Sequence, residues 1–238
     1  MSQNIVQPYR FAGDFIPTNI SSCVGWWDIS DIDTITKDGS NLVSQVDDKS
    51  GNSYNLIQNT GANQPTWLSA DQNGLDTLSF FYTGSGASYS MQIASATIAT
   101  QPLTMVIAYL SGDGATSGQC NLYGAGGTRC DYYDFSGAES DRHRIYAGAQ
   151  LKYNEDIGHQ WNQLTNLYNG VNSFMRLNGV EKTSGNSGSA SQADLAIGSD
   201  NDGNQSMKIG ELICYDKELS ASETTQVEDY LKDKWDTA

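Results

Sequence analysis

Short runs of alternating hydrophobic and polar residues recur along most of the chain, and Gly, Asn, Asp and Ser separate one run from the next. About a dozen of these runs predict β-strands, from residues 23–29 to residues 207–218. Residues 102–110 are the most apolar run and are expected to form a central strand. No helical segments alternate with the strands. This favours an all-β, two-sheet antiparallel β-sandwich or jelly roll over a βαβ sheet.

The end of the chain departs from this pattern, because residues 208–235 read as a strand followed directly by a helix. Ser220 and Glu223 have the spacing of a capping box, in which each satisfies a backbone N–H of the first helical turn. Apolar residues after the cap fall on one helical stripe: Val227, Tyr230, Leu231 and Trp235. We therefore predict a helix over residues 220–235 that packs on the sandwich, with the acidic residues between the apolar positions in solvent.

The chain shows no internal repeat and no linker that would divide its 238 residues. We expect residues 1–20 to form an N-terminal arm and residues 21–238 to form one domain, since 38% hydrophobic residues suffice for a core. The net charge of −15 argues against a nucleic-acid partner. No stretch approaches the roughly 20 apolar residues that span a bilayer, so no membrane insertion is expected. The N-terminal residues contain no apolar run typical of a signal peptide.

Several segments resemble one known family. The closing sequence GELICYDKELSASETTQVEDYLKDKW (residues 210–235) is similar to the last strand and helix of laminin-G-like domains, within the concanavalin A-like lectin/glucanase superfamily. WWDISDIDTIT (26–36), VDDKSGNSYNLIQNTGANQPTW (46–67) and LYNGVNSFMRLNGV (167–180) resemble further family motifs in the same order, whereas residues 112–158 match none. The resemblance implies two packed antiparallel sheets with the helix as a lid. It leaves function open, because this fold serves lectins, glycosidases, lyases and adhesion modules.

Catalytic motifs are absent. The glucanase branch uses the pattern E-x-D-x-x-E, and the nearest approach, Glu139 with Asp141, lacks the second glutamate. The two histidines, His143 and His159, are expected to lie on the surface, and no Gly-x-Ser-x-Gly elbow supports a serine nucleophile. We therefore predict that the chain is not an enzyme.

A cation site is a candidate where Asp200, Asp202 and Asn204 alternate around a glycine, because oxygen ligands in this pattern suit calcium. The resemblance also implies calcium, which many relatives hold near their rim loops. A second acidic cluster contains Asp28, Asp31 and Asp33. The alternative is that Asx-Gly sequences simply form turns.

The four cysteines, Cys23, Cys120, Cys130 and Cys214, have no C-x-x-C spacing. We expect free thiols. The alternative is a disulfide between Cys120 and Cys130 across a hairpin.

Glycan binding requires an exposed aromatic ring beside polar side chains, because sugars present apolar C–H faces and hydroxyl rims. The candidates are Trp67, Asn121, Arg129, Asp131, Tyr132, Tyr133 and Arg142. Trp26, Trp27, Trp161 and Trp235 are expected in the core or against the helix, and core packing is an alternative for Trp67 as well.

These observations favour a non-catalytic recognition or assembly module. Such domains usually act outside cells, yet the sequence shows no secretion signal and little sign of disulfides. A virion surface protein made in host cytoplasm, such as a phage capsid decoration or a fibre or tail component, would reconcile these facts; a leaderless secretion route is the alternative. Its expected partners are host glycans or other virion proteins, with a homo-oligomer possible. The rival functions are a polysaccharide-degrading enzyme and a structural virion subunit without a ligand.

Overall fold

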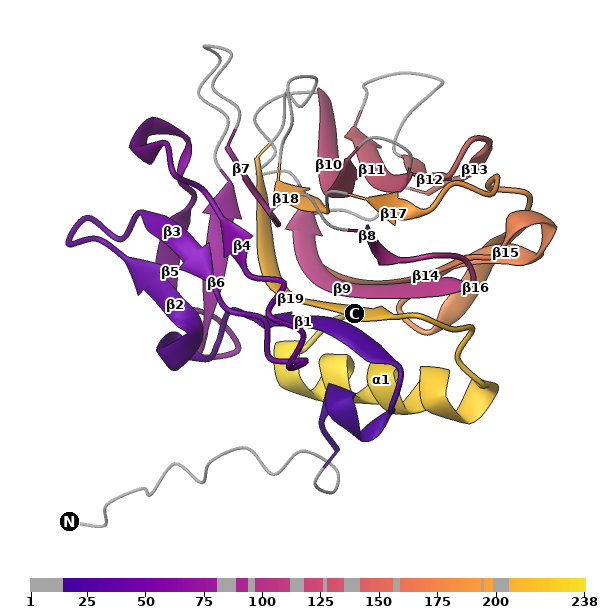
Figure 1. The fold of residues 1–238 in the computed structure, drawn as a ribbon, viewed down its shortest axis with the longest axis horizontal. Coiled ribbons are helices and arrows are strands. Elements are labelled where there is room, and N and C mark those ends of the chain that lie inside the picture. Colours follow the sequence, from indigo (N-terminus) through magenta and orange to yellow (C-terminus); the bar gives the residue numbers. More distant parts are fainter. Residues whose placement is uncertain are drawn as a thin grey trace.

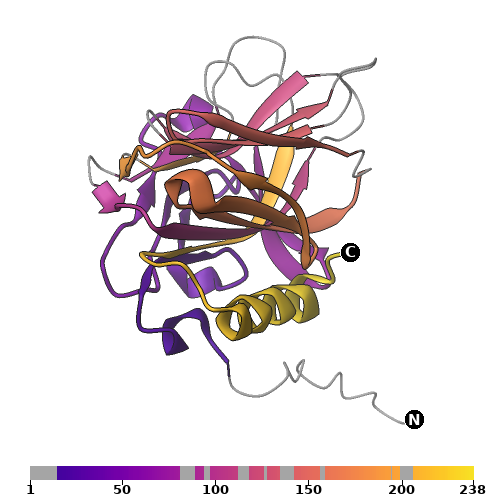
Figure 2. The same ribbon diagram turned by 90° about the vertical axis from the view of Figure 1, so that its right-hand side faces the viewer.

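A computed structural model shows two antiparallel sheets packed face to face, with one helix on the outside of the first sheet (Figures 1 and 2). The structure describes residues 15–80, 89–93, 97–111, 118–125, 128–134, 142–155, 159–193, 195–198 and 206–238. For residues 118–120, 125, 131–134, 142 and 192–193 it describes the backbone only. The predicted all-β, two-sheet antiparallel sandwich with a C-terminal helix is confirmed.

The first sheet, called sheet A, has the strand order β16-β15-β14-β9-β19-β6-β5, and β1 pairs with β19 beside this path. Its strands are β1 (Cys23–Asp28), β5 (Thr66–Gln72), β6 (Leu75–Phe80), β9 (Leu103–Ser111), β14 (Trp161–Tyr168), β15 (Ser173–Leu177), β16 (Val180–Gly185) and β19 (Met207–Tyr215).

The second sheet, sheet B, has the order β13-β12-β11-β10-β18-β7-β4-β3-β2. Its strands are β2 (Ile35–Lys37), β3 (Val43–Val46), β4 (Leu56–Ile57), β7 (Ser90–Gln92), β10 (Gly118–Ala125), β11 (Thr128–Asp134), β12 (Arg142–Tyr146), β13 (Gln150–Asn154) and β18 (Ala196–Gly198). The remaining elements are the paired strands β8 (Thr97–Ala99) and β17 (Gln192–Ala193), the 3-10 turns η1 (Pro17–Asn19), η2 (Ile32–Thr34), η3 (Gly61–Asn63) and η4 (Gly170–Asn172), and the helix α1 (Ala221–Trp235).

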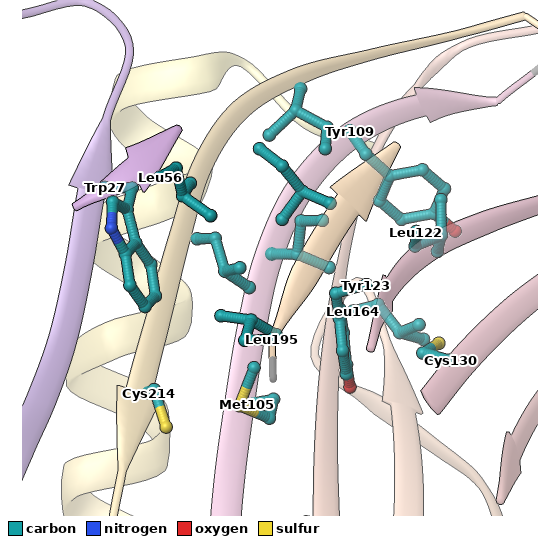
Figure 3. Packing of buried hydrophobic residues seen from close by; sticks show 14 of the residues in the cluster. Trp27, Leu56, Met105, Tyr109, Leu122, Tyr123, Cys130, Leu164, Leu195 and Cys214 are labelled. Atoms are coloured by element: carbon teal, nitrogen blue, oxygen red, sulfur yellow. The ribbon is translucent and has the colours of Figure 1, made fainter. Parts of the chain in front are cut away.

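Strand β9 is central in sheet A, as its apolar sequence predicts, and both of its faces are buried. Met105, Ile107 and Tyr109 point into the core between the sheets, which Figure 3 shows in part. The intervening Val106 and Ala108 belong to a second core, between sheet A and α1. Because alternate side chains of a strand face opposite ways, a continuous apolar run is what a strand between two layers requires.

Helix α1 begins as predicted, because the Ser220 side chain accepts a hydrogen bond from the backbone N–H of Glu223 and the Glu223 carboxylate accepts one from that of Ser220. The apolar stripe packs on sheet A, with Val227, Leu231 and Trp235 fully buried. The expectation that the acidic residues between these positions are solvated is wrong for Glu228. This residue is only 5% exposed, because its carboxylate pairs with the Arg176 guanidinium of β15 at 2.8 Å.

The described end of the predicted arm, residues 15–20, packs beside α1. The Phe15 ring lies 5.7 Å from the Tyr230 ring in an edge-on arrangement, and Ile20 is buried in the second core. Residues 1–14 lie outside the described part of the chain.

Two of the family-like motifs have structural roles. The Asp48 carboxylate accepts backbone hydrogen bonds from Trp26 at 2.9 Å, Ser50 at 2.8 Å and Tyr54 at 3.1 Å, which fixes the loop after β3 against β1. Asn178 and Gly179 both have positive φ angles, 49° and 78°, and join β15 to β16. Asn-Gly is the sequence that favours such a hairpin turn.

Candidate functional site

Strands β11, β12 and β13 present a polar outer surface on sheet B. Buried residues on β12 and β13, His143, Ile145, Leu151 and Tyr153, alternate with half-buried or exposed ones. We call the surface formed by the alternate residues the outer face; its described members are Arg129, Arg144, Tyr146, Gln150, Lys152 and Asn154. Since these residues lie on neighbouring strands, their side chains form rows across the sheet.

One row of the outer face joins an aromatic ring to a cation and an amide. Tyr146 lies opposite Arg129 on one side and opposite Gln150 on the other. The Arg129 guanidinium lies over the Tyr146 ring, 4.8 Å from its centroid. Such a cation–π contact fixes the orientation of the ring, while Gln150 adds an amide that can both donate and accept hydrogen bonds.

Six of the seven predicted ligand-binding residues lie on adjacent strands of this region. Asn121 is on β10 and opposite Asp131, and Arg142 is opposite Tyr133. Asn121 is only 2% exposed. Arg129, Asp131, Tyr132 and Tyr133 all lie on β11, and Arg142 begins β12. The strand register thus brings these six positions together although they span more than twenty positions of sequence.

Trp67 lies apart from this group, on β5 of sheet A. Its ring packs against the main core, and the Lys37 ammonium lies over the ring, 4.6 Å from its centroid. Its indole N–H is buried and, among the described residues, has no hydrogen-bond partner.

Sequence reasoning missed Arg144, Tyr146, Gln150 and Lys152 as members of the outer face. The signal was present in the alternation of residues 142–146, which places Arg144 and Tyr146 at the same strand period as Arg142. The absence of a family motif over residues 112–158 hid it.

The prediction that both histidines lie on the surface is wrong for His143. It is fully buried, its ring stacks on Tyr153 with centroids 5.0 Å apart, and its Nε2 hydrogen-bonds the Tyr109 hydroxyl. Burial lowers the pKa of His143 to about 3, so the ring is neutral at physiological pH. His159 is exposed as expected.

The predicted cation ligands Asp200, Asp202 and Asn204 lie outside the described residues. In the described part of the chain, no group of three or more His, Cys, Asp or Glu side chains is arranged to hold a metal ion. In the second acidic cluster, Asp28 and Asp31 form ion pairs with lysines. Lys49 pairs with Asp28 at 3.1 Å and with Asp31 at 2.6 Å, while Asp33 is exposed.

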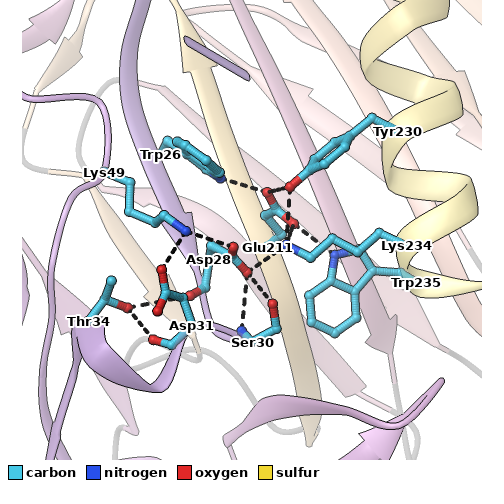
Figure 4. Close-up of polar contacts among 10 residues, drawn as sticks. All are labelled: Trp26, Asp28, Ser30, Asp31, Thr34, Lys49, Glu211, Tyr230, Lys234 and Trp235. Carbon is cyan, nitrogen blue, oxygen red and sulfur yellow. Dashed lines mark hydrogen bonds and ion pairs between the residues drawn. The ribbon is translucent and has the colours of Figure 1, made fainter. Parts of the chain in front are cut away.

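A network of buried charges joins β1, β19 and α1 (Figure 4). The Lys234 ammonium lies 2.7 Å from the Asp28 carboxylate and 2.7 Å from the Glu211 carboxylate. Glu211, fully buried, also accepts hydrogen bonds from the indole N–H groups of Trp26 at 2.6 Å and Trp235 at 2.9 Å. These contacts occupy both carboxylates and fasten the helix to the sheet.

Burial and ion pairing shift the two carboxyl groups in opposite directions. Burial raises the pKa of Glu211 above its ordinary value, against the attraction of Lys234. Burial would also raise the pKa of Asp28, but the ammonium groups of Lys234 and Lys49 lower it below its ordinary value.

Cys23 and Cys214 are buried free thiols, as expected. Cys130 is also buried, and its Sγ accepts a hydrogen bond from the Asn166 side-chain amide at 3.4 Å. The side chain of Cys120 lies outside the described part of the structure. No helix among the described residues has both the length and the apolar character needed to cross a bilayer.

No protein-family model matches the chain, and no curated protein matches its sequence. Solved structures share its fold at low identity. The sialidase of Trypanosoma rangeli in complex with sialic acid aligns with a TM-score of 0.61 and 12% identity, over 92% of this chain and 34% of the sialidase. The binding domain of Paraclostridial Mosquitocidal Protein 1 aligns with a TM-score of 0.59 and 14% identity, over 87% of this chain and 52% of that one. Domain 4 of AbnA, an extracellular arabinanase from Geobacillus stearothermophilus in complex with arabinotriose, aligns with a TM-score of 0.58 and 13% identity.

The chain covers about half of the mosquitocidal binding domain (52%) and about a third of the sialidase (34%), but 98% of the arabinanase domain. At such low identity these alignments show a shared β-sandwich fold. Membership of the laminin-G-like family stays a prediction from the sequence motifs.

Proposed function

We propose that this chain is a non-catalytic carbohydrate-recognition module that binds a glycan on the outer face of β11–β13. The observation that carries the proposal is the Tyr146 ring, held by Arg129 at 4.8 Å and flanked in register by Gln150. A sugar ring would stack its C–H face on the tyrosine, while the neighbouring amide and guanidinium groups would bind its hydroxyls.

The fold neighbours support this proposal at the level of class. Two of them were solved with sugars, sialic acid for the trypanosomal sialidase and arabinotriose for the arabinanase domain. The arabinanase domain also matches this chain in extent, since the chain covers nearly all of it (98%).

The burial of one carboxylate pair, Asp28 and Glu211, supports the non-catalytic part of the proposal. Glycosidases place two carboxyl groups on either side of an accessible sugar bond. Asp28 and Glu211 are close to one another, but they are 4% and 0% exposed and both bind Lys234. Both carboxylates are therefore buried and neutralised by Lys234, so this pair is not arranged to act on a polysaccharide.

Calcium binding by Asp200, Asp202 and Asn204, and a place on the surface of a virion, remain part of the proposal on the strength of the sequence alone. Calcium near a rim loop would either bridge to sugar hydroxyls or order the loop.

The test is a glycan array probed with the purified chain in calcium and again in a chelator. We expect saturable binding to at least one glycan, and loss of that binding on chelation if calcium takes part. Binding to no glycan under either condition would contradict the recognition function. Reducing ends released from any bound polysaccharide would contradict the non-catalytic assignment.

A further inference from the structure

The loop between β4 and β5, residues 58–64, contributes side chains to the lining of two hollows. The first hollow has a volume of about 330 Å³ and lies where β4 meets β7. It is lined by Ile57, Gln58, Asn59, Thr60, Ser90 and Gln92. The second has a volume of about 410 Å³, and its lining includes Leu42, Gln64, Thr66 and Tyr89. Both volumes fall in the range of small-ligand sites.

Among the described residues, no charged side chain lines either hollow, although 17% of the chain is charged. The linings consist of amide and hydroxyl side chains beside a few apolar groups, among them Ile57, Leu42 and the Tyr89 ring. Amides and hydroxyls both donate and accept hydrogen bonds, which matches the dual character of a sugar hydroxyl. Because the described lining has no cation and no carboxylate, it offers no opposite charge to a phosphate or to a metal ion, and this favours an uncharged ligand.

The first hollow is held in shape by Gln58. Its side-chain amide donates to the Ser90 carbonyl at 2.6 Å, and its side-chain oxygen accepts from the Thr60 backbone N–H at 3.0 Å. The Gln64 amide closes the loop by donating to the Gln58 carbonyl at 2.8 Å. A fixed wall lowers the entropy cost of binding.

Two other amides of this hollow remain available. Asn59 and Gln92 are exposed, and their side chains make no hydrogen bond within the described part of the chain. Gln92 lies opposite Ile57 in the pairing of β7 with β4. The apolar and polar groups of the hollow are therefore next to each other, as the face and rim of a sugar require.

We propose that the loop of residues 58–64 forms a second carbohydrate site, specific for uncharged saccharides. It is separate from the outer face of β11–β13, where Arg129, Arg144 and Lys152 provide three cations. The second site goes beyond the proposed function and can hold or fail independently of it.

The experiment follows the side-chain amide signals of the ¹⁵N-labelled chain by NMR during titration with excess arabinotriose, xylotriose, cellotriose and maltotriose. We expect at least one trisaccharide to shift the amide signals of Asn59 and Gln92 saturably. The double variant Asn59→Ala/Gln92→Ala should weaken that binding about tenfold or more. Gln226→Ala, which removes an exposed amide from α1, is the matched control and should leave it unchanged. Backbone signals of each variant report that it folds.

Failure of this site is distinguishable from failure of the first. If no trisaccharide shifts these amides, or if the double variant binds like the wild type, the second site is overturned. If Tyr146→Ala alone abolishes the binding of these trisaccharides, they bind the outer face, and the second site is likewise overturned.

Discussion

Lys234 places its ammonium group between two carboxylates, 2.7 Å from Asp28 and 2.7 Å from Glu211. All three groups are buried. Removing one member of a buried ion cluster leaves the opposite charge without compensation, which costs more than the intact cluster contributes.

We therefore predict that Lys234→Ala lowers the free energy of unfolding at neutral pH by about 3–5 kcal/mol, measured by urea denaturation. Lys232→Ala removes an exposed lysine from the same helix and should change the free energy by no more than about 0.5 kcal/mol. Equal stabilities of the two variants would show that the network does not hold the helix.

His143 gives a second prediction at this scale, because its pKa is lowered to about 3 from an ordinary value near 6.5. In the unfolded chain, the imidazole of His143 takes up a proton below about pH 6.5. In the folded chain, the same imidazole stays neutral until about pH 3. The fold therefore loses stability as the pH falls between these values, by about 1.4 kcal/mol per pH unit at most.

His143→Gln removes this contribution, so its free energy of unfolding should fall less steeply than that of the wild type between pH 6 and about pH 4. Denaturation curves at several pH values measure the slope. His159→Gln, at an exposed position, should keep the wild-type slope. Identical slopes for all three proteins would contradict the buried neutral histidine.

Single residues were the hardest part to predict from the sequence. The alternation of residues 142–146 places His143 between two outward positions, yet two arginines beside it suggested a polar surface. Glu228 and Lys234 likewise look solvent-exposed in a helix pattern, because their partners, Arg176 and Glu211, lie far away in the sequence. Pairings over such separations are visible only after folding.

Helix α1 meets sheet A at a glycine. A Cβ atom added to Gly210 would lie 2.6 Å from the Trp235 ring, so the closing motif needs a glycine where the tryptophan packs. Gly210→Ala should therefore push the helix from the sheet and lower the free energy of unfolding by about 1–3 kcal/mol.

Gly39→Ala is the matched control, because nothing lies within 4 Å of a Cβ added there, and it should leave stability nearly unchanged. Thermal unfolding followed by tryptophan fluorescence compares the two variants. A Gly210→Ala protein as stable as the Gly39→Ala protein would argue against close packing at this contact.

Elements were predicted well where the pattern was local. The capping box, the apolar stripe of α1 and the central position of β9 all follow from spacing within one segment. The partners of each strand do not, since β19 pairs with β9, β6 and β1 from distant parts of the chain.

The molecule consists of two packed sheets. Helix α1 packs on sheet A, and sheet B carries the polar outer face of β11–β13. Six of the predicted ligand-binding positions converge on β10–β12 because that stretch of chain folds into consecutive antiparallel strands. Trp67 belongs to the opposite sheet, which no spacing in the sequence indicates.

The most direct test of the recognition site is a calorimetric titration of the best array glycan into the wild type, Tyr146→Ala and Gln226→Ala. We predict that Tyr146→Ala weakens binding about tenfold or more, because the ring supplies the stacking surface, and that Gln226→Ala binds like the wild type. Equal affinity of the folded Tyr146→Ala protein and the wild type would contradict glycan recognition by the outer face of β11–β13.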